Sequence, residues 1–218
     1  MKAMYGTLTA PILWYQLLAA TLTDLGFTIN VYDPCVANKL IDGKQFAVCW
    51  YVDDLKLSHE SSEVVSDMIK VIESKFGKMT VTRGQKHTYL GIEFEIKNKR
   101  VHINMKEYLQ ECIDSYGESI MCNATTPATK ELMEVNENSQ RLENFRKDKF
   151  HHIVAKLLYI SKRSRLDLQV SIGYLCTRVQ YPTVDDWKKL QRVLQYICGT
   201  INIERIVPMK PSGKFIFY

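Results

Sequence analysis

The sequence predicts an α+β fold in which helices and antiparallel strands share the first half of the chain and helices dominate the second. Two observations carry this prediction. Short apolar runs flank tight-turn signals such as Asp42-Gly43, which is typical of β-hairpins. After residue 149, apolar residues recur at helical spacing instead, and 218 residues are enough to bury a core without staples.

Two helices are expected in the first half. The first covers residues 11–25, because Pro11 suits a first helical position and Gly26 can end a helix. The second covers residues 62–76, whose apolar side chains share one face behind a serine cap at position 61 or 62.

Strands are expected between and after these helices. Residues 35–37 and 46–50 form apolar runs on either side of the Asp42-Gly43 signal, and residues 55–58 alternate as a half-buried strand does. Residues 89–96 and 101–104 predict a further hairpin.

The remainder of the chain predicts helices separated by a polar segment. Residues 108–116 and the stretch from Phe150 onward have helical spacing, and Thr183-Val-Asp-Asp186 is a capping-box variant that opens another helix. Residues 123–148 are polar and contain Thr126-Pro127, which indicates a linker or exposed loop.

The net charge of +5 is concentrated in the last third of the chain. Residues 151–218 hold 11 Lys/Arg and 4 Asp/Glu, whereas residues 1–150 hold 18 and 20. A basic C-terminal part suits a polyanion partner, although solvated helix faces can account for part of the excess.

Other compositional features exclude several classes of protein. No apolar run approaches the roughly 20 residues of a membrane span, and the first residues do not form a signal peptide. The six cysteines are scattered without a CxxC pair, so we expect reduced, mostly buried thiols of an intracellular protein rather than a disulfide framework or a zinc site.

Asp53 and Asp54 form the pattern with the clearest chemistry. Two adjacent carboxylates between strand-like runs repel each other unless a cation such as Mg²⁺ lies between their oxygens. Adjacent aspartates are also common without a metal. Asp185-Asp186 is such a pair, because the first turn of a helix favours negative charge by itself. Spacing alone leaves both interpretations of Asp53-Asp54 open.

The residues around this pair resemble a known family. Tyr51-Val-Asp-Asp54 is similar to the Tyr-x-Asp-Asp signature of reverse transcriptases, and the order of the surrounding motifs resembles copia-type retrotransposon polymerases. The further landmarks, in order, are Lys2-Ala-Met-Tyr-Gly6 with Ala10-Pro11 and Trp14-Tyr15, Gly26-Phe27, Asp33-Pro-Cys-Val36, Tyr89-Leu-Gly-Ile-Glu93, Thr126-Pro127, Ala155-Lys-Leu-Leu-Tyr159, Arg165-Leu-Asp-Leu-Gln169 and Gln195-Tyr-Ile-Cys-Gly-Thr200.

The resemblance implies the C-terminal part of a right-hand polymerase. The expected divisions are a partial palm with the catalytic hairpin at 1–104, the start of a helical thumb at 105–122, the linker at 123–148, a helical thumb or connection at 149–205, and the approach to a ribonuclease H domain at 206–218. The resemblance also implies a cytoplasmic protein, within a virus-like particle and without a membrane.

The implied activity is RNA- and DNA-templated DNA synthesis. Asp53 and Asp54 would be catalytic ligands of Mg²⁺, with Mn²⁺ as an alternative. The implied partners are a template–primer duplex, deoxynucleoside triphosphates and the remainder of a Gag-Pol-type polyprotein. The residues expected beside the nucleotide or primer are Tyr51, Val52, Gly6 and Pro11, with Tyr89, Leu90 and Gly91 as a primer grip.

The basic residues of the last third are candidates for contacts with the nucleic-acid backbone. Each one taken singly is more often a solvated side chain. The candidates are Lys156, Lys162, Arg163, Arg165, Lys188, Lys189 and Arg192.

Some positions depart from the family pattern. Thr7-Leu8-Thr9 replaces the family's Leu-Lys-Gln, and Arg165-Leu166-Asp167 replaces Arg-Pro-Asp, which indicates either a divergent branch or a degraded copy. The family's first catalytic aspartate lies upstream of the Lys2–Gly6 motif, so we expect residues 1–218 alone to lack polymerase activity. The alternatives are a non-catalytic nucleic-acid-binding remnant and an inactive pseudogene product.

Overall fold

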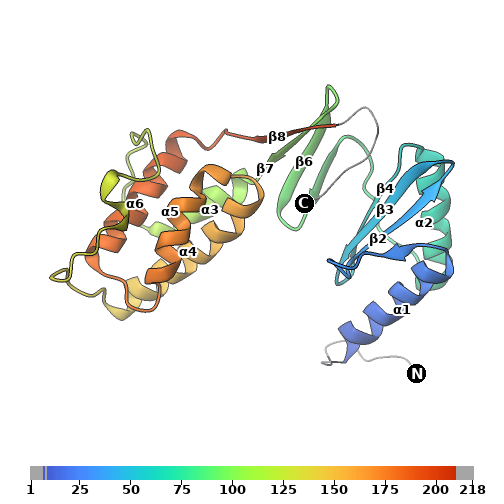
Figure 1. The fold of residues 1–218 in the computed structure, drawn as a ribbon, viewed down its shortest axis with the longest axis horizontal. Coiled ribbons are helices and arrows are strands. Elements are labelled where there is room, and N and C mark those ends of the chain that lie inside the picture. Colours follow the sequence, from blue (N-terminus) through green and yellow to red (C-terminus); the bar gives the residue numbers. More distant parts are fainter. Residues whose placement is uncertain (1–6, 8, 210–218) are drawn as a thin grey trace. The chain divides into compact units, whose positions relative to one another are not determined.

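The chain divides into two compact units, each with its own core (Figure 1). This computed structural model describes residue 7 and residues 9–209. Unit 1 comprises the described residues up to Thr82 together with Met209, and unit 2 comprises Arg83–Pro208. Both units combine antiparallel strands with helices, which confirms the predicted α+β class.

Unit 1 is a four-stranded antiparallel sheet with two helices packed on one face (Figure 1). The strands lie in the order β1-β2-β3-β4, so β4 is an edge strand. The core between sheet and helices includes Leu18 and Leu22 of α1, Phe46 and Val48 of β3, and Ile72 of α2. The elements are α1 (Ala10–Asp24), β1 (Thr28–Ile29), β2 (Val36–Ile41), β3 (Lys44–Tyr51), β4 (Asp54–Ser58) and α2 (Ser62–Phe76).

Local sequence signals account for the elements of unit 1. Asp42 and Gly43 adopt φ of 52° and 74°, the left-handed backbone that a two-residue hairpin turn needs and that Asp and Gly tolerate. Ser61 caps α2, because its side chain accepts the N–H of Val64. The predicted hairpin and the 62–76 helix are therefore confirmed, and α1 begins and ends one residue before its predicted bounds.

Unit 2 combines a second four-stranded antiparallel sheet with a helical cluster. The strands lie in the order β5-β6-β7-β8, and β8 pairs with β7 after the chain has passed through all the helices. The core is built by α3, α4, α5 and α6. The elements are β5 (Lys86–Tyr89), β6 (Ile92–Lys97), β7 (Arg100–Asn104), α3 (Lys106–Tyr116), η1 (Lys130–Met133), α4 (Asn144–Arg163), η2 (Leu166–Leu168), α5 (Gln169–Arg178), α6 (Val184–Gly199) and β8 (Arg205–Pro208).

Two boundaries in unit 2 differ from the sequence prediction. The expected strand over 89–96 is interrupted, because Leu90 and Gly91 form a turn between β5 and β6. Helix α4 begins at Asn144, inside the predicted 123–148 linker. Most residues of its first turns are exposed, so no apolar periodicity marks them in the sequence. Of the predicted 206–218 segment, the described residues up to 208 belong to β8 and residues 210–218 lie outside the described part.

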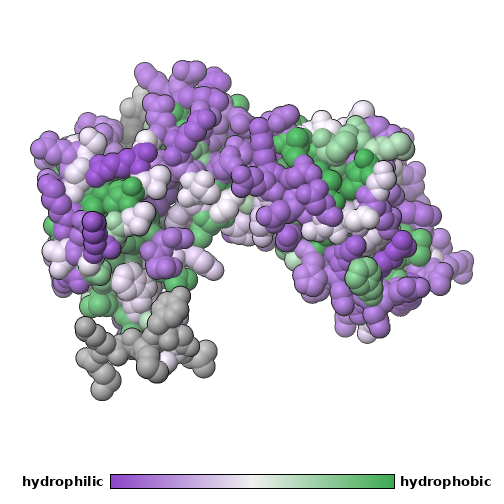
Figure 2. Space-filling view, turned by 180° about the vertical axis from the view of Figure 1, so that it is seen from behind, coloured by the Kyte–Doolittle hydropathy of each residue, from purple (hydrophilic) through white to green (hydrophobic). Residues whose placement is uncertain are grey.

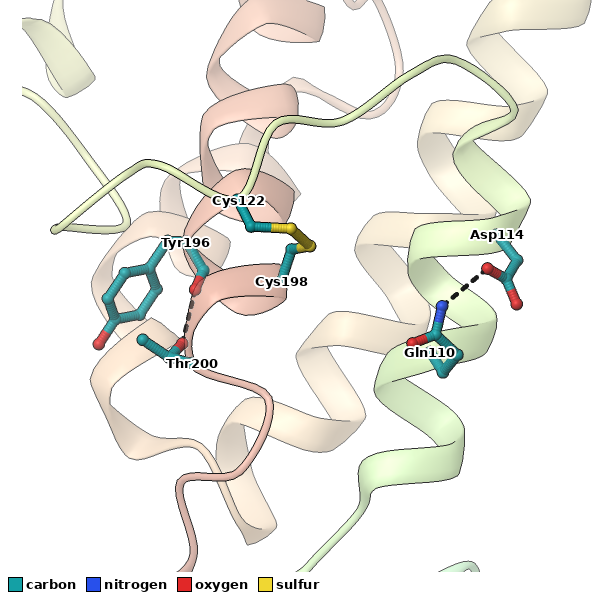
Figure 3. The surroundings of a disulfide bond; sticks show 6 residues. All are labelled: Gln110, Asp114, Cys122, Tyr196, Cys198 and Thr200. Atoms are coloured by element: carbon teal, nitrogen blue, oxygen red, sulfur yellow. Dashed lines mark hydrogen bonds between the residues drawn. A yellow bond between two sulfur atoms is a disulfide. The ribbon is translucent and has the colours of Figure 1, made fainter.

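The expectation that all cysteines are reduced is wrong in this structure. Cys122, in the loop after α3, is joined by a disulfide to Cys198 near the end of α6 (Figure 3). The two Cα atoms are 5.0 Å apart although 76 residues separate them in sequence. A side chain at the neighbouring Gly199 would lie 3.2 Å from the carbonyl oxygen of Cys122, so the glycine permits this close approach. The spacing of the cysteines along the sequence does not predict this disulfide.

Among the helices that the structure describes, none is both long and apolar enough to cross a bilayer. Hydrophilic side chains cover most of the face drawn in Figure 2, with apolar patches between them.

We predict that reduction of the Cys122–Cys198 disulfide destabilises unit 2. A native disulfide typically contributes about 2–4 kcal/mol, so the thermal midpoint should fall by roughly 5–15 °C when dithiothreitol is added. Circular dichroism with and without reductant measures the shift. Cys122→Ser should have the low midpoint in both conditions, and Cys35→Ser, at a free thiol, should behave like the parent. A midpoint that does not respond to reductant would contradict the prediction.

Candidate functional site

The carboxylate pair lies at the tip of the β3–β4 hairpin. Trp50 pairs with Leu55 and Tyr51 pairs with Asp54, so Val52 and Asp53 form the connection. All four residues from Tyr51 to Asp54 are exposed. This confirms the expected hairpin with the aspartates at its turn, packed on α2 through the core of unit 1.

A tryptophan from α1 holds the turn in place. Val52 adopts φ of 54°, a left-handed conformation that disfavours a β-branched residue. The indole N–H of Trp14 donates a hydrogen bond to the carbonyl oxygen of Val52. The Trp14 ring itself packs edge-on against Phe76 of α2, with ring centroids 4.9 Å apart. The position of the carboxylates therefore depends on how both helices pack.

The face of β4 that carries Asp54 also carries a half-buried cation. Side chains alternate along a strand, so Lys56 lies on the same face as Asp54, while Leu55 and Leu57 pack against the core. Burial lowers the pKa of Lys56 and raises the pKa of Cys49, its cross-strand partner. A raised pKa makes Cys49 a poor nucleophile. Lys56 was not predicted as a site residue. Its position between two leucines of a predicted strand was a signal that could have identified it.

Asp53 and Asp54 fit part of a Mg²⁺ site. Their carboxylates offer hard oxygen ligands that solvent and substrate phosphates can reach. Within residues 9–209 the structure brings together no group of three His, Cys, Asp or Glu side chains that could hold a metal ion. Asp33, another carboxylate of unit 1, accepts the backbone N–H of Cys35 within its own turn. Asp53 and Asp54 could therefore hold one side of a Mg²⁺ ion, and the remaining ligands would have to come from outside the described residues.

The second aspartate pair has the structural role that its sequence context indicated. Asp186 is 2% exposed and accepts hydrogen bonds from the N–H and hydroxyl of Thr183, at 2.9 Å each, which completes the predicted capping box. Arg178 donates to the same carboxylate at 3.2 Å. These partners satisfy Asp186 without a metal.

The Tyr89-Leu90-Gly91 segment forms a turn that receives a hydrogen bond from an aromatic side chain of another element. Leu90 and Gly91 adopt φ of 53° and 71°. The hydroxyl of Tyr159, on α4, donates a 2.7 Å hydrogen bond to the carbonyl oxygen of Leu90. The same arrangement occurs at Val52. In both turns an apolar residue has a positive φ, and an aromatic side chain donates a hydrogen bond to the carbonyl oxygen of that residue.

Arg165 does not reach the surface, so its predicted contact with nucleic acid is wrong. Its side chain is fully buried and donates to the carboxylate of Asp167 at 2.8 and 3.0 Å. Thr200, at the end of α6, accepts from the same guanidinium through its carbonyl and its hydroxyl. Arg165 joins η2 to α6, and burial of a paired cation could not be recognised from the sequence.

Most of the other predicted cations have partners within unit 2. Lys156 forms an ion pair with Glu111 at 3.2 Å, and Arg192 donates to the hydroxyl of Thr126 at 3.1 Å. Lys189 donates to the carbonyl oxygen of Glu134. Lys162 is exposed, and Lys188 is 68% exposed beside Asp185.

Two residues of the N-terminal motif, Pro11 and Gly6, were predicted to lie beside the nucleotide. Pro11 lies in the first turn of α1 and is exposed. Gly6 lies outside the described residues.

Comparison with known proteins identifies the class. Residues 1–130 match the family model described as reverse transcriptase (RNA-dependent DNA polymerase), and this match covers more than half of the chain. The chain therefore belongs to the reverse transcriptase family. No solved structure matches the chain.

The related proteins specify the branch that the motifs predicted. A retrovirus-related Pol polyprotein from transposon RE2 of Arabidopsis thaliana is 24% identical over 91% of this chain, which spans 13% of the polyprotein. A retrovirus-related Pol polyprotein from transposon TNT 1-94 of Nicotiana tabacum is 19% identical over 91% of the chain and 15% of the polyprotein. A putative transposon Ty5-1 protein of Saccharomyces cerevisiae is 22% identical over 90% of the chain and 63% of that protein. The chain is thus part of a copia-type reverse transcriptase.

We predict that Trp14→Phe loosens the carboxylate turn. Phenylalanine can keep the packing against Phe76 but cannot donate to Val52, and loss of one such hydrogen bond should speed amide exchange in residues 51–54 about 2–10-fold. Hydrogen exchange with mass spectrometry measures the change. The control is Tyr15→Phe, which keeps the neighbouring ring that packs beside Trp50. Equal exchange in both variants would show that the indole N–H does not hold the turn.

Proposed function

We propose that residues 1–218 supply the Asp53-Asp54 part of a polymerase active site and a duplex-binding surface in unit 2. The observation that carries the proposal is the exposed carboxylate pair on a turn fixed by Trp14. In this proposal unit 1 is part of the palm, and the helices of unit 2 form the thumb or connection.

The chemistry proposed is nucleotidyl transfer to a primer 3′-hydroxyl. Mg²⁺, or Mn²⁺, held by Asp53 and Asp54 would activate the hydroxyl and stabilise the leaving pyrophosphate. The chain's own contribution is positioning, which supplies much of the rate in phosphoryl transfer. Tyr51 and Val52 directly precede the carboxylates and would lie beside the nucleotide and the primer end.

A complete site needs a further carboxylate, and the sheet has a place for it. Strand β4 is an edge strand, so its outer backbone groups can pair with another strand. Asp54 is the first residue of β4, which would bring a ligand on that added strand close to the pair. We propose that this strand comes from another part of the polyprotein, as do the remaining contacts to deoxynucleoside triphosphate and template.

Unit 2 is proposed to contact the backbone of the template–primer duplex. Lys162, Arg163 and Lys188 are the predicted cations that carry this proposal best, because Lys162 and Lys188 are exposed and Arg163 is half-buried beside an aromatic ring. The remaining candidates with internal partners, Lys156, Lys189 and Arg192, would contribute less.

We predict that residues 1–218 alone do not extend a primer, whereas a longer chain with the upstream strand does so with Mg²⁺. In that longer chain Asp53→Asn or Asp54→Asn should reduce extension at least about 100-fold, since each change removes a metal ligand. Asp67→Asn is the control, because it removes an exposed carboxylate on α2, outside the β3–β4 hairpin, and should leave extension unchanged. Incorporation of labelled nucleotide measures the activity. Mg²⁺-dependent extension by residues 1–218 would contradict the proposed incomplete site.

We predict that unit 2 binds a duplex in a salt-dependent manner. Each phosphate neutralised contributes about −0.9 to the slope of log affinity against log salt on duplex DNA. Lys162→Ala and Lys188→Ala should each flatten that slope by up to about 0.9, as measured by fluorescence anisotropy. Lys70→Ala, an equally exposed cation on α2, should not change it. An unchanged slope in both unit 2 variants would show that their charges serve only solvation.

A further inference from the structure

We propose that Tyr159 is a positioning residue that holds the Leu90-Gly91 turn in the shape that contacts a phosphate of the primer strand. This inference rests on the proposed function for its ligand. Tyr159 ends the Ala155–Tyr159 motif, to which the family resemblance assigned no role of its own.

The hydrogen bond to the turn is the first observation. Tyr159 donates to the carbonyl oxygen of Leu90 across 69 residues of sequence at 2.7 Å. Leu90 holds a left-handed φ of 53°, which a leucine adopts rarely, and such conformations persist where their surroundings impose them. Unit 2 offers an internal comparison. The next turn, between β6 and β7, has Asn98 at φ 51° in the position that corresponds to Leu90, followed by Lys99 at φ 57°, and asparagine tolerates this backbone by itself.

The second observation is that Tyr159 belongs to a row of two aromatic rings and two cations. The guanidinium of Arg163 lies 3.6 Å from the centre of the Tyr159 ring and also donates to the backbone carbonyl of Tyr159. On α3, the Tyr108 ring packs edge-on against Tyr159 with centroids 6.0 Å apart, and Lys156 lies 5.5 Å from the centre of the Tyr108 ring. This row fixes the Tyr159 ring and places the Arg163 guanidinium against it.

The third observation is the open space at the turn. A side chain added at Gly91 would meet nothing within 4 Å, and Gly91 itself is exposed. A nucleic-acid backbone can therefore approach the turn closely. Arg163 is a cation suited to phosphate, because its guanidinium presents several donors in a plane. The combination of an open turn and a neighbouring arginine favours a phosphate group over a base or an apolar ligand.

The test separates the positioning role from general stability. Tyr159→Phe keeps the ring under Arg163 and removes only the donor to Leu90. Tyr174→Phe is a matched control, because the Tyr174 hydroxyl also donates to a backbone carbonyl, that of Glu134, and also has a cation, Lys189, beside its ring. Hydrogen exchange over residues 86–92 and anisotropy with a labelled primer–template duplex are measured for both variants.

We expect Tyr159→Phe to speed exchange at residues 89–92 and to weaken duplex binding, each about 2–10-fold, with no such change in Tyr174→Phe. Adding Leu90→Asn to Tyr159→Phe should restore slow exchange, because asparagine copies the turn at Asn98 and needs no clamp.

Each contrary result overturns a defined part of the proposal. Unchanged exchange at residues 89–92 in Tyr159→Phe would show that the tyrosine does not hold the turn. Faster exchange with unchanged duplex affinity would overturn the phosphate contact alone. Absence of duplex binding by the parent protein would overturn the proposed function of unit 2, and with it the phosphate contact, while the exchange data would still decide whether Tyr159 holds the turn.

Discussion

Left-handed backbone at two hairpin turns sets where the Asp53-Asp54 carboxylates and the exposed Gly91 lie. Val52 and Leu90 each adopt a positive φ, which L-amino-acid residues disfavour by about 1–2 kcal/mol. At each turn an aromatic side chain from a helix donates to the carbonyl of the strained residue, Trp14 in unit 1 and Tyr159 in unit 2. A net hydrogen bond contributes about 1 kcal/mol, which is similar in size to the backbone cost. The packing of the helices therefore sets the geometry of both turns.

The same dependence on packing explains how unit 2 uses its positive charge. Arg165 is fully buried and bonded to Asp167 and Thr200, so it fastens η2 to the end of α6. Removal of the Asp167 carboxylate would leave the buried Arg165 charge without its ion-pair partner, which is strongly destabilising. The positive excess of the last third is thus partly a feature of the fold. Fewer basic side chains are therefore available to a polyanion than the count of basic residues in the sequence implied.

Local signals predicted the elements that depend on local physics. Helix α2 followed from one apolar face and a serine cap, and α6 from its capping box. The prediction of one continuous strand over 89–96 was wrong, because the apolar residues in this stretch gave no sign of the Leu90-Gly91 turn. The first turns of α4 were missed because they have little apolar face. The Cys122–Cys198 pair was missed because spacing along the chain says nothing about two residues that meet only in the folded state.

The sequence by itself determined the family, the α+β class and the place of Asp53-Asp54 between two strands, because motif order and residue periodicity are local properties. Only the tertiary structure decided which donors hold the turns, which cations are buried and which cysteines pair. The Trp14–Val52 and Tyr159–Leu90 hydrogen bonds span 38 and 69 residues, and the Arg165–Thr200 contact spans 35. Contacts at such separations form when helices and sheets pack, and no short stretch of residues encodes them.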